Sequence, residues 1–193
     1  MSTAAARRLT PDDLLRLPDD GKVYELIDGD LKEKPVSKAS SRIGVRFARF
    51  LDVFCDAHNA GWVYGPDNGF RCFPDDPGRV RKPDVAFVSV ARMPVGTYED
   101  EGFCTTAPDL VVEVVSPNDL ASEVEEKRDE WLAAGVRAVW IVHPETRTVH
   151  AHTSAGGYAF LRESDTLTAQ DLLPGFAVPV ADLFRRPTGQ PPA

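Results

Sequence analysis

The stretch Leu110-Val111-Val112-Glu113-Val114-Val115 places a single acidic residue inside an apolar run, directly before Ser116-Pro117. A short, continuous apolar run of this kind predicts a strand that is buried on both faces of a sheet. A carboxylate in such a strand costs several kcal/mol unless it is paired, protonated or bound to a metal. Glu113 therefore marks a candidate functional site at the centre of the fold.

A second lone acid, Asp84, stands near the start of another apolar run, from Pro83 to Val88. Carboxylate oxygens are the ligands that Mg²⁺ prefers, and Mn²⁺ accepts the same ligands. Two acids on neighbouring buried strands therefore predict a site for Mg²⁺, with Mn²⁺ as an alternative. A metal ion held there would polarise a phosphodiester and lower the pKa of an attacking water, which is the chemistry of a nuclease.

The third candidate lies on the helix expected from about Asp119 to Ala134. Val124, Lys127 and Trp131 recur at spacings of three and four residues, so Lys127 shares the apolar face of that helix. Its ammonium would then reach the two carboxylates and stabilise charge on a phosphate. The alternative is that Lys127 extends past the core to a surface partner such as Glu130, as long lysines often do.

Glu25 is the fourth candidate, on a strand predicted from Val23 to Ile27. Alternation along a strand puts Glu25 on the face of Val23 and Ile27, so its carboxylate can point inward, towards the metal. An exposed glutamate on an edge strand is the alternative. Asp28-Gly29 then predicts a hairpin turn, followed by a return strand from Asp30 to Val36.

The rest of the chain alternates between helical and strand patterns, with no internal repeat and no domain linker. A short helix is expected to open at Thr10, and a long one to run from about Ser40 to His58. Further strands are predicted at residues 62–64, 70–73, 85–90, 138–142, 148–153 and 158–161, and a last apolar segment at 178–184. The strand, helix and strand between residues 110 and 142 predict a right-handed crossover.

These elements together predict an α/β fold, with a mixed sheet core flanked by helices and additional β-hairpins. We expect a single domain over residues 1–184. The segment 185–193 is rich in proline and polar residues, and it is expected to form a mobile tail.

Four motifs recur in a characteristic order, and they end on Glu126-Lys127 with Trp131 downstream. The earlier three are Tyr24 to Gly29, Lys82 to Val85, and Pro108 to Pro117. In this order and spacing the chain resembles the Uma family of restriction endonucleases, part of the PD-(D/E)XK nuclease superfamily. The resemblance runs from about residue 9 to residue 184. It implies a restriction-endonuclease-like core, Mg²⁺ dependence and hydrolysis of phosphodiester bonds in DNA.

The resemblance also carries the four candidate residues into one active site. It implies Asp84 and Glu113 as metal ligands, Glu25 as an accessory ligand or water holder, and Lys127 as the electrostatic element. In the superfamily's standard pattern a lysine lies two residues after the second acid, where this chain has Val115. The family supplies its lysine from the following helix, and Lys127 matches that place.

Two positions depart from the family's pattern. Ser40 and Ser41 stand where many members carry a histidine near the start of the long helix, and His143-Pro144 stands where many have an aspartate before proline. A nuclease fold that no longer cuts, and instead binds DNA or a protein partner, is therefore the alternative function.

Charge limits the mode of nucleic-acid binding. The formal net charge of −8 argues against a non-specific coat on nucleic acid. Arg42, Arg46 and Arg49 nevertheless gather on the long helix, where they would either guide a phosphate-bearing substrate or face solvent. Cutting both strands of a duplex would favour a symmetric homodimer.

The three cysteines, Cys55, Cys72 and Cys104, form no C-x-x-C motif, so neither a disulfide framework nor a zinc site is predicted. The N-terminus has no secretory signal, and the apolar runs are too short to cross a membrane. We therefore expect a cytoplasmic protein without a membrane partner.

Overall fold

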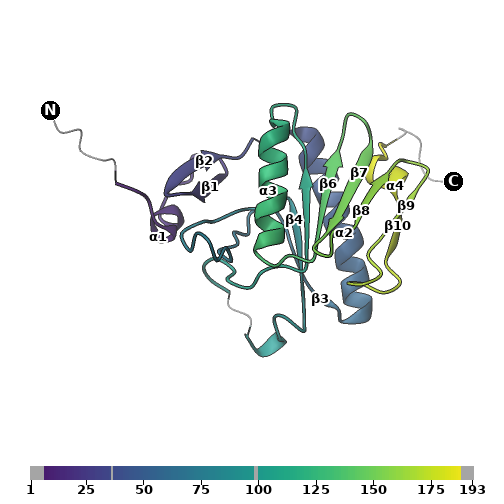
Figure 1. Ribbon diagram of the computed structural model, residues 1–193, viewed down its shortest axis with the longest axis horizontal. Coiled ribbons are helices and arrows are strands. Elements are labelled where there is room, and N and C mark those ends of the chain that lie inside the picture. Colours follow the sequence, from purple (N-terminus) through teal and green to yellow (C-terminus); the bar gives the residue numbers. More distant parts are fainter. Residues whose placement is uncertain (1–6, 36, 98–99, 188–193) are drawn as a thin grey trace.

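A six-stranded sheet in the order β3-β4-β5-β6-β7-β8 forms the centre of the computed structural model, which describes residues 7–35, 37–97 and 100–187. The strands are β3 (Gly61–Tyr64), β4 (Val85–Ser89), β5 (Leu110–Val114), β6 (Ala138–His143), β7 (Thr148–Thr153) and β8 (Tyr158–Leu161). β5 and β6 are parallel, and every other neighbouring pair in this sheet is antiparallel. The predicted mixed α/β fold is confirmed (Figure 1).

Helix α3 (Ala121–Ala133) connects the parallel strands β5 and β6 on one face of the sheet (Figure 1). Its Trp131 is fully buried against apolar side chains of the sheet, which include Val111 and Val139. All five residues of β5 are buried, Glu113 among them. The strand predicted to be buried on both faces is therefore present at the centre of the sheet.

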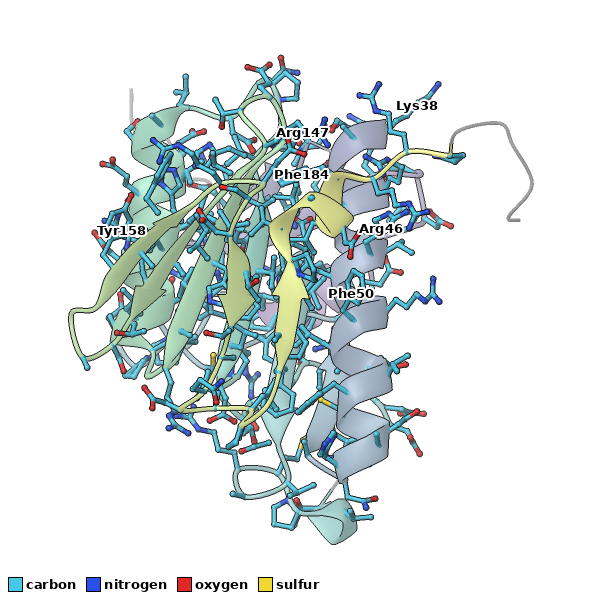
Figure 2. All side chains as sticks on the ribbon, turned by 90° about the vertical axis from the view of Figure 1, so that its right-hand side faces the viewer. Lys38, Arg46, Phe50, Arg147, Tyr158 and Phe184 are labelled. Carbon is cyan, nitrogen blue, oxygen red and sulfur yellow. The ribbon has the colours of Figure 1, made fainter. Side chains whose placement is uncertain are left out.

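The opposite face is covered by helix α2 (Lys38–His58) and the short helix α4 (Val180–Phe184) (Figures 1 and 2). The buried stripe of α2 consists of Ile43, Phe47, Leu51 and Cys55, together with Ser40 and Gly44. The helix begins two residues before the predicted start because Ser37 caps it. The Ser37 hydroxyl accepts the Ser40 N–H, and the Ser40 hydroxyl accepts the Ser37 N–H.

Two arginines of α2 have structural partners at the carboxyl end of α4. Arg42 donates to the carbonyl of Arg185 and Arg46 to that of Asp182, each at 2.8 Å. Figure 2 shows Arg46 on α2 and Phe184 on α4, the two elements that these hydrogen bonds join. The last carbonyls of a helix lack partners within the helix, and these guanidinium groups supply them. Arg49 alone of the three predicted basic residues is exposed.

The N-terminal part lies beside the sheet instead of within it (Figure 1). It comprises α1 (Pro11–Leu15) and the hairpin of β1 (Tyr24–Ile27) and β2 (Asp30–Glu33). Leu26 exchanges two backbone hydrogen bonds with Val80, at 2.9 and 2.8 Å. Leu14, Leu26 and Val80 also form a small buried cluster. These contacts attach the hairpin to the segment that leads into β4.

The strand predicted at residues 70–73 is wrong, and one pair of strands was missed. Residues 70–73 form no strand, since Phe70 makes only isolated bridges with Arg81 and Cys104. Their apolar character reflects core packing, because the ring of Phe70 lies edge-on to that of Trp131. The antiparallel pair β9 (Thr166–Thr168) and β10 (Ala177–Pro179) was not predicted.

The expected mobile tail lies mostly at residues 188–193, outside the described residues. Across the described ranges, no helix combines the length and the apolar character needed to cross a membrane.

Truncation of Leu51 tests the interface between α2 and the sheet. Leu51 is fully buried, so Leu51→Ala should lower the free energy of unfolding by about 2–5 kcal/mol. Val53→Ala on the same helix is the control, because Val53 is 63% exposed and should change it by no more than about 0.5 kcal/mol. Urea unfolding measures both, and equal losses would contradict this packing.

Candidate active site

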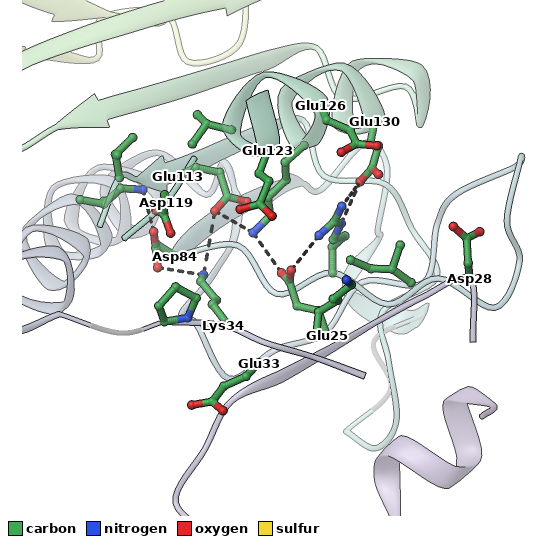
Figure 3. Close-up of a pocket in the computed structure, with 18 residues that line it drawn as sticks. Glu25, Asp28, Glu33, Lys34, Asp84, Glu113, Asp119, Glu123, Glu126 and Glu130 are labelled. Atoms are coloured by element: carbon green, nitrogen blue, oxygen red, sulfur yellow. Dashed lines mark hydrogen bonds and ion pairs between the residues drawn. The ribbon is translucent and has the colours of Figure 1, made fainter. Parts of the chain in front are cut away.

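A cavity of about 370 Å³ lies between the β1–β2 hairpin, the carboxyl end of β5 and helix α3 (Figure 3). Glu25 of β1, Asp84 just before β4, Glu113 of β5 and Lys127 of α3 all line it. All four residues predicted from the sequence therefore meet at one cavity, although they come from four separate segments.

Asp84 and Glu113 form a pair of acids in this cavity, and Glu113 is the more deeply buried of the two. Its Oε1 accepts a hydrogen bond from the indole N–H of Trp131 at 2.9 Å, and its Oε2 lies 3.1 Å from the ammonium of Lys127. Burial raises the pKa of Glu113 above its ordinary value, and the nearby carboxylates add to the rise, whereas Lys127 and Lys34 oppose it. Further positive charge at this carboxylate would therefore be stabilising.

Asp84 faces Glu113 across a shared ammonium. Its Oδ2 accepts the backbone N–H of Val114 at 2.6 Å, which holds the carboxylate against β5. Its Oδ1 lies 2.9 Å from the Nζ of Lys34, and the same Nζ lies 3.9 Å from Oε2 of Glu113. The two carboxylates thus converge on one point, as the sequence predicted.

Glu25 is buried, and its carboxylate contacts two basic side chains and a backbone N–H. Its Oε2 accepts from Arg81 at 2.9 Å, and its Oε1 accepts the Lys82 N–H at 2.8 Å and lies 3.0 Å from Lys127 Nζ. Burial favours the neutral acid, but the charges of Lys127 and Arg81 prevail and lower the pKa of Glu25 to about 2. The alternative of an exposed edge-strand glutamate is wrong.

The ammonium of Lys127 lies 3.1 Å from Oε2 of Glu113 and 3.0 Å from Oε1 of Glu25. Burial alone would lower its pKa, but the two carboxylates outweigh burial and raise the pKa above its ordinary value. The ammonium is therefore charged at neutral pH. The alternative in which Lys127 reaches a surface partner is wrong, and Glu130 instead pairs with Arg81 at 2.6 Å.

Sequence reasoning missed three residues of this network: Lys34, Arg81 and Trp131 as a hydrogen-bond donor. A signal for Lys34 existed in the hairpin. The Asp28-Gly29 turn sets the register in which Glu25 pairs with Lys32. Two residues further along each strand, Lys34 pairs with Val23. Cross-strand partners share a face, so Lys34 lies on the face of Glu25.

The donor chemistry fits a divalent cation. Asp84 and Glu113 present hard oxygen atoms to one point, and that point already attracts a cation, the ammonium of Lys34. Within the described ranges, no group of three or more potential ligands surrounds a common point. Glu25 contacts Lys127 and Arg81, and its expected role as an accessory ligand or water holder stays a prediction.

Comparison with known proteins identifies the family of this chain. The model of the Uma2 family, described as "Putative restriction endonuclease", matches residues 11–181. The chain belongs to the Uma2 family. The resemblance inferred from the motifs is thereby confirmed, and the matched range of this Uma2 chain contains all four predicted site residues.

A solved structure shares the fold of this Uma2 member. It is described as a putative nuclease belonging to DUF820 from Anabaena variabilis, and it is 19% identical in sequence. The match covers 91% of this chain and 97% of that one, with a TM-score of 0.75. A search among curated proteins found no match.

Neutralising Glu25 tests its role in the buried network. Glu25→Gln leaves Lys127 and Arg81 short of negative charge, so it should cost about 3–5 kcal/mol of unfolding free energy at pH 7. Because folding lowers this pKa from 4.5 to about 2, the stabilisation is complete above pH 4.5 and is lost as the pH falls towards 2.

The difference between wild type and variant should therefore stay constant from pH 7 to pH 5 and narrow at lower pH. Urea unfolding across that range measures it. Glu33→Gln on the same hairpin is the control, since Glu33 pairs with Lys22 at the surface and should matter by less than about 1 kcal/mol. A difference that does not depend on pH would contradict the assignment.

Proposed function

We propose that this chain is a metal-dependent endonuclease that hydrolyses phosphodiester bonds in DNA. The observation that carries the proposal is the convergence of Asp84 and Glu113 on one cation position, next to the buried ammonium of Lys127. Membership of a family described as "Putative restriction endonuclease" supports DNA as the substrate.

Asp84 and Glu113 would hold Mg²⁺, or Mn²⁺ in its place. When bound, such an ion supplies Lewis acidity towards the scissile phosphate and lowers the pKa of a water molecule. The protein keeps both carboxylates in place through the Val114 N–H and the Trp131 indole. Because both carboxylates are fixed in this way, they would need little reorganisation when a metal ion binds. This favours a defined coordination geometry.

Lys127 supplies a fixed positive charge and not a base, because its pKa is raised. A buried ammonium beside the cavity can stabilise the negative charge that develops on the phosphate oxygens, and burial strengthens this effect. Glu25 is the positioning residue for Lys127. Its other contacts, to Arg81 and the Lys82 N–H, fix the carboxylate that holds the ammonium.

Cleavage of both strands of a duplex would need two copies of the site, so a homodimer on DNA belongs to the proposal. We also infer a cytoplasmic location, where the protein would meet cellular DNA.

The second candidate is a nuclease fold that binds DNA or a protein without cutting. One observation favours it: the protein's own lysines already compensate Asp84 and Glu113. Incubating wild type with Mg²⁺ or Mn²⁺ and duplex, single-stranded or branched DNA separates the two. Products from any of these substrates support the endonuclease. If none of the substrates is cleaved under any of these conditions, the binding module is the function that remains.

Removal of either acid charge tests the metal site. Asp84→Asn and Glu113→Gln keep the shape of each side chain but remove the charge that a divalent ion needs. Each should weaken Mn²⁺ binding at least about 10-fold, measured by titration calorimetry, and abolish cleavage. Glu126→Gln is the control, since Glu126 is an exposed acid at the rim of the same cavity. Wild-type affinity in both variants would rule out the pair as ligands.

Lys127→Met tests the electrostatic element. Methionine keeps much of the apolar stem but removes the charge, so cleavage should fall by roughly 10²-fold or more. Metal binding should persist. Arg128→Met on the same helix is the control, because Arg128 pairs with Asp129 at the surface. If both variants cleave at the wild-type rate, Lys127 has no catalytic role.

A further inference from the structure

Lys34 holds a position that the proposed mechanism does not use. Its Nζ lies 2.9 Å from Oδ1 of Asp84 and 3.9 Å from Oε2 of Glu113, and it donates to the carbonyl of Lys82 at 2.7 Å. The side chain is only 11% exposed. Figure 3 shows the ammonium of Lys34 between the two carboxylates. A surface lysine with a chance neighbour would not be enclosed in this way.

The backbone delivers this ammonium to the site. Lys34 follows β2, and its N–H donates to the carbonyl of Val23 at 2.8 Å, which extends the hairpin pairing. The hairpin is in turn attached to the segment before β4 by the paired hydrogen bonds of Leu26 and Val80. The anchored hairpin therefore limits the region that the ammonium can reach.

The place of this ammonium coincides with the place that a divalent ion needs. Mg²⁺ binds oxygen ligands at about 2.1 Å and keeps several waters, so it requires the space between the same oxygens of Asp84 and Glu113. Two cations cannot share that space, because their charges repel each other and their volumes overlap. A divalent ion can enter only if the ammonium leaves.

The structure offers room for the displaced side chain. A second cavity, of about 330 Å³, lies on the side of α2, and both Lys34 and Asp84 line it. Its wall also includes Ser40 and Ser41 near the start of α2, and Asp67 after β3. The exposed Ser41 hydroxyl and Asp67 carboxylate can accept hydrogen bonds from an ammonium, whereas the Ser40 hydroxyl is engaged in the cap of α2.

We propose that Lys34 is a tethered cation that occupies the divalent-ion position of the acid pair, so that metal binds by displacing its ammonium towards the second cavity. Lys34 thereby lowers the metal affinity of the site and keeps Asp84 and Glu113 in ligand geometry until metal arrives. This inference rests on the proposed function, because it concerns the same acid pair.

Calorimetric titration of the full chain with Mn²⁺ tests the competition. Lys34→Met removes the competing charge, so its affinity for Mn²⁺ should exceed that of wild type by at least about 10-fold. Lys22→Met is the matched control: it removes the same charge just before β1 of the same hairpin, but Lys22 is exposed and pairs with Glu33 at the surface, so its affinity should stay within about 2-fold of wild type. If the methionine variant fails to fold, Lys34→Gln should show the same gain in Mn²⁺ affinity.

A second readout needs no variant. Amine acylation followed by mass spectrometry should label Lys34 several-fold faster when Mg²⁺ saturates the wild-type protein, because displacement releases the ammonium from its carboxylates. Labelling of Lys22 should not change. Melting of Lys34→Met in a chelator should occur at a lower temperature than that of wild type, because the acid pair loses its counter-charge.

The outcomes separate the two proposals. If wild type and both Lys34 variants bind Mn²⁺ equally, the tethered-cation inference is overturned and the endonuclease proposal stands. If only the Lys34 variants bind, the inference is supported in its strongest form. If none of them binds a divalent ion, the metal-dependent function falls, and the inference falls with it.

Discussion

The carboxylate of Glu113 sits within the central strand β5, where it is tolerated because Trp131, Lys127 and Lys34 surround it with donors and positive charge. A buried carboxylate without such partners would cost several kcal/mol or would take up a proton. Helix α3 meets this need, since it supplies both the indole and one ammonium. The network that stabilises the fold is therefore also the network that forms the candidate site.

The β1–β2 hairpin contributes the other half of the network, although it adds no strand to the main sheet. One hairpin supplies Glu25, which holds Lys127, and Lys34, which holds Asp84. Any movement of the hairpin relative to β4 would change both contacts together. The hydrogen bonds between Leu26 and Val80 are therefore as relevant to the site as to the fold, because they set where the hairpin lies.

Sequence reasoning succeeded where a local pattern has a single physical meaning. An acid inside an apolar run must be buried and compensated, and Glu113 is both. Helical spacing placed Lys127 on the face of Trp131, and that face does meet the sheet. The same reasoning failed at residues 70–73, because apolar residues in a loop that packs on the core resemble those of a strand.

The sequence by itself determined the kinds of element, the burial of the acids and the inward face of α3, since all of these depend on neighbours within a few positions. Only the tertiary structure decided which charges meet. Lys34 and Asp84 are 50 positions apart, and Glu25 and Arg81 are 56 apart. Periodicity indicates the face on which a charge lies. The partner that meets it depends on how the hairpin, β4 and α3 pack together, and that packing is set by contacts distant in sequence, such as those of Leu26 with Val80.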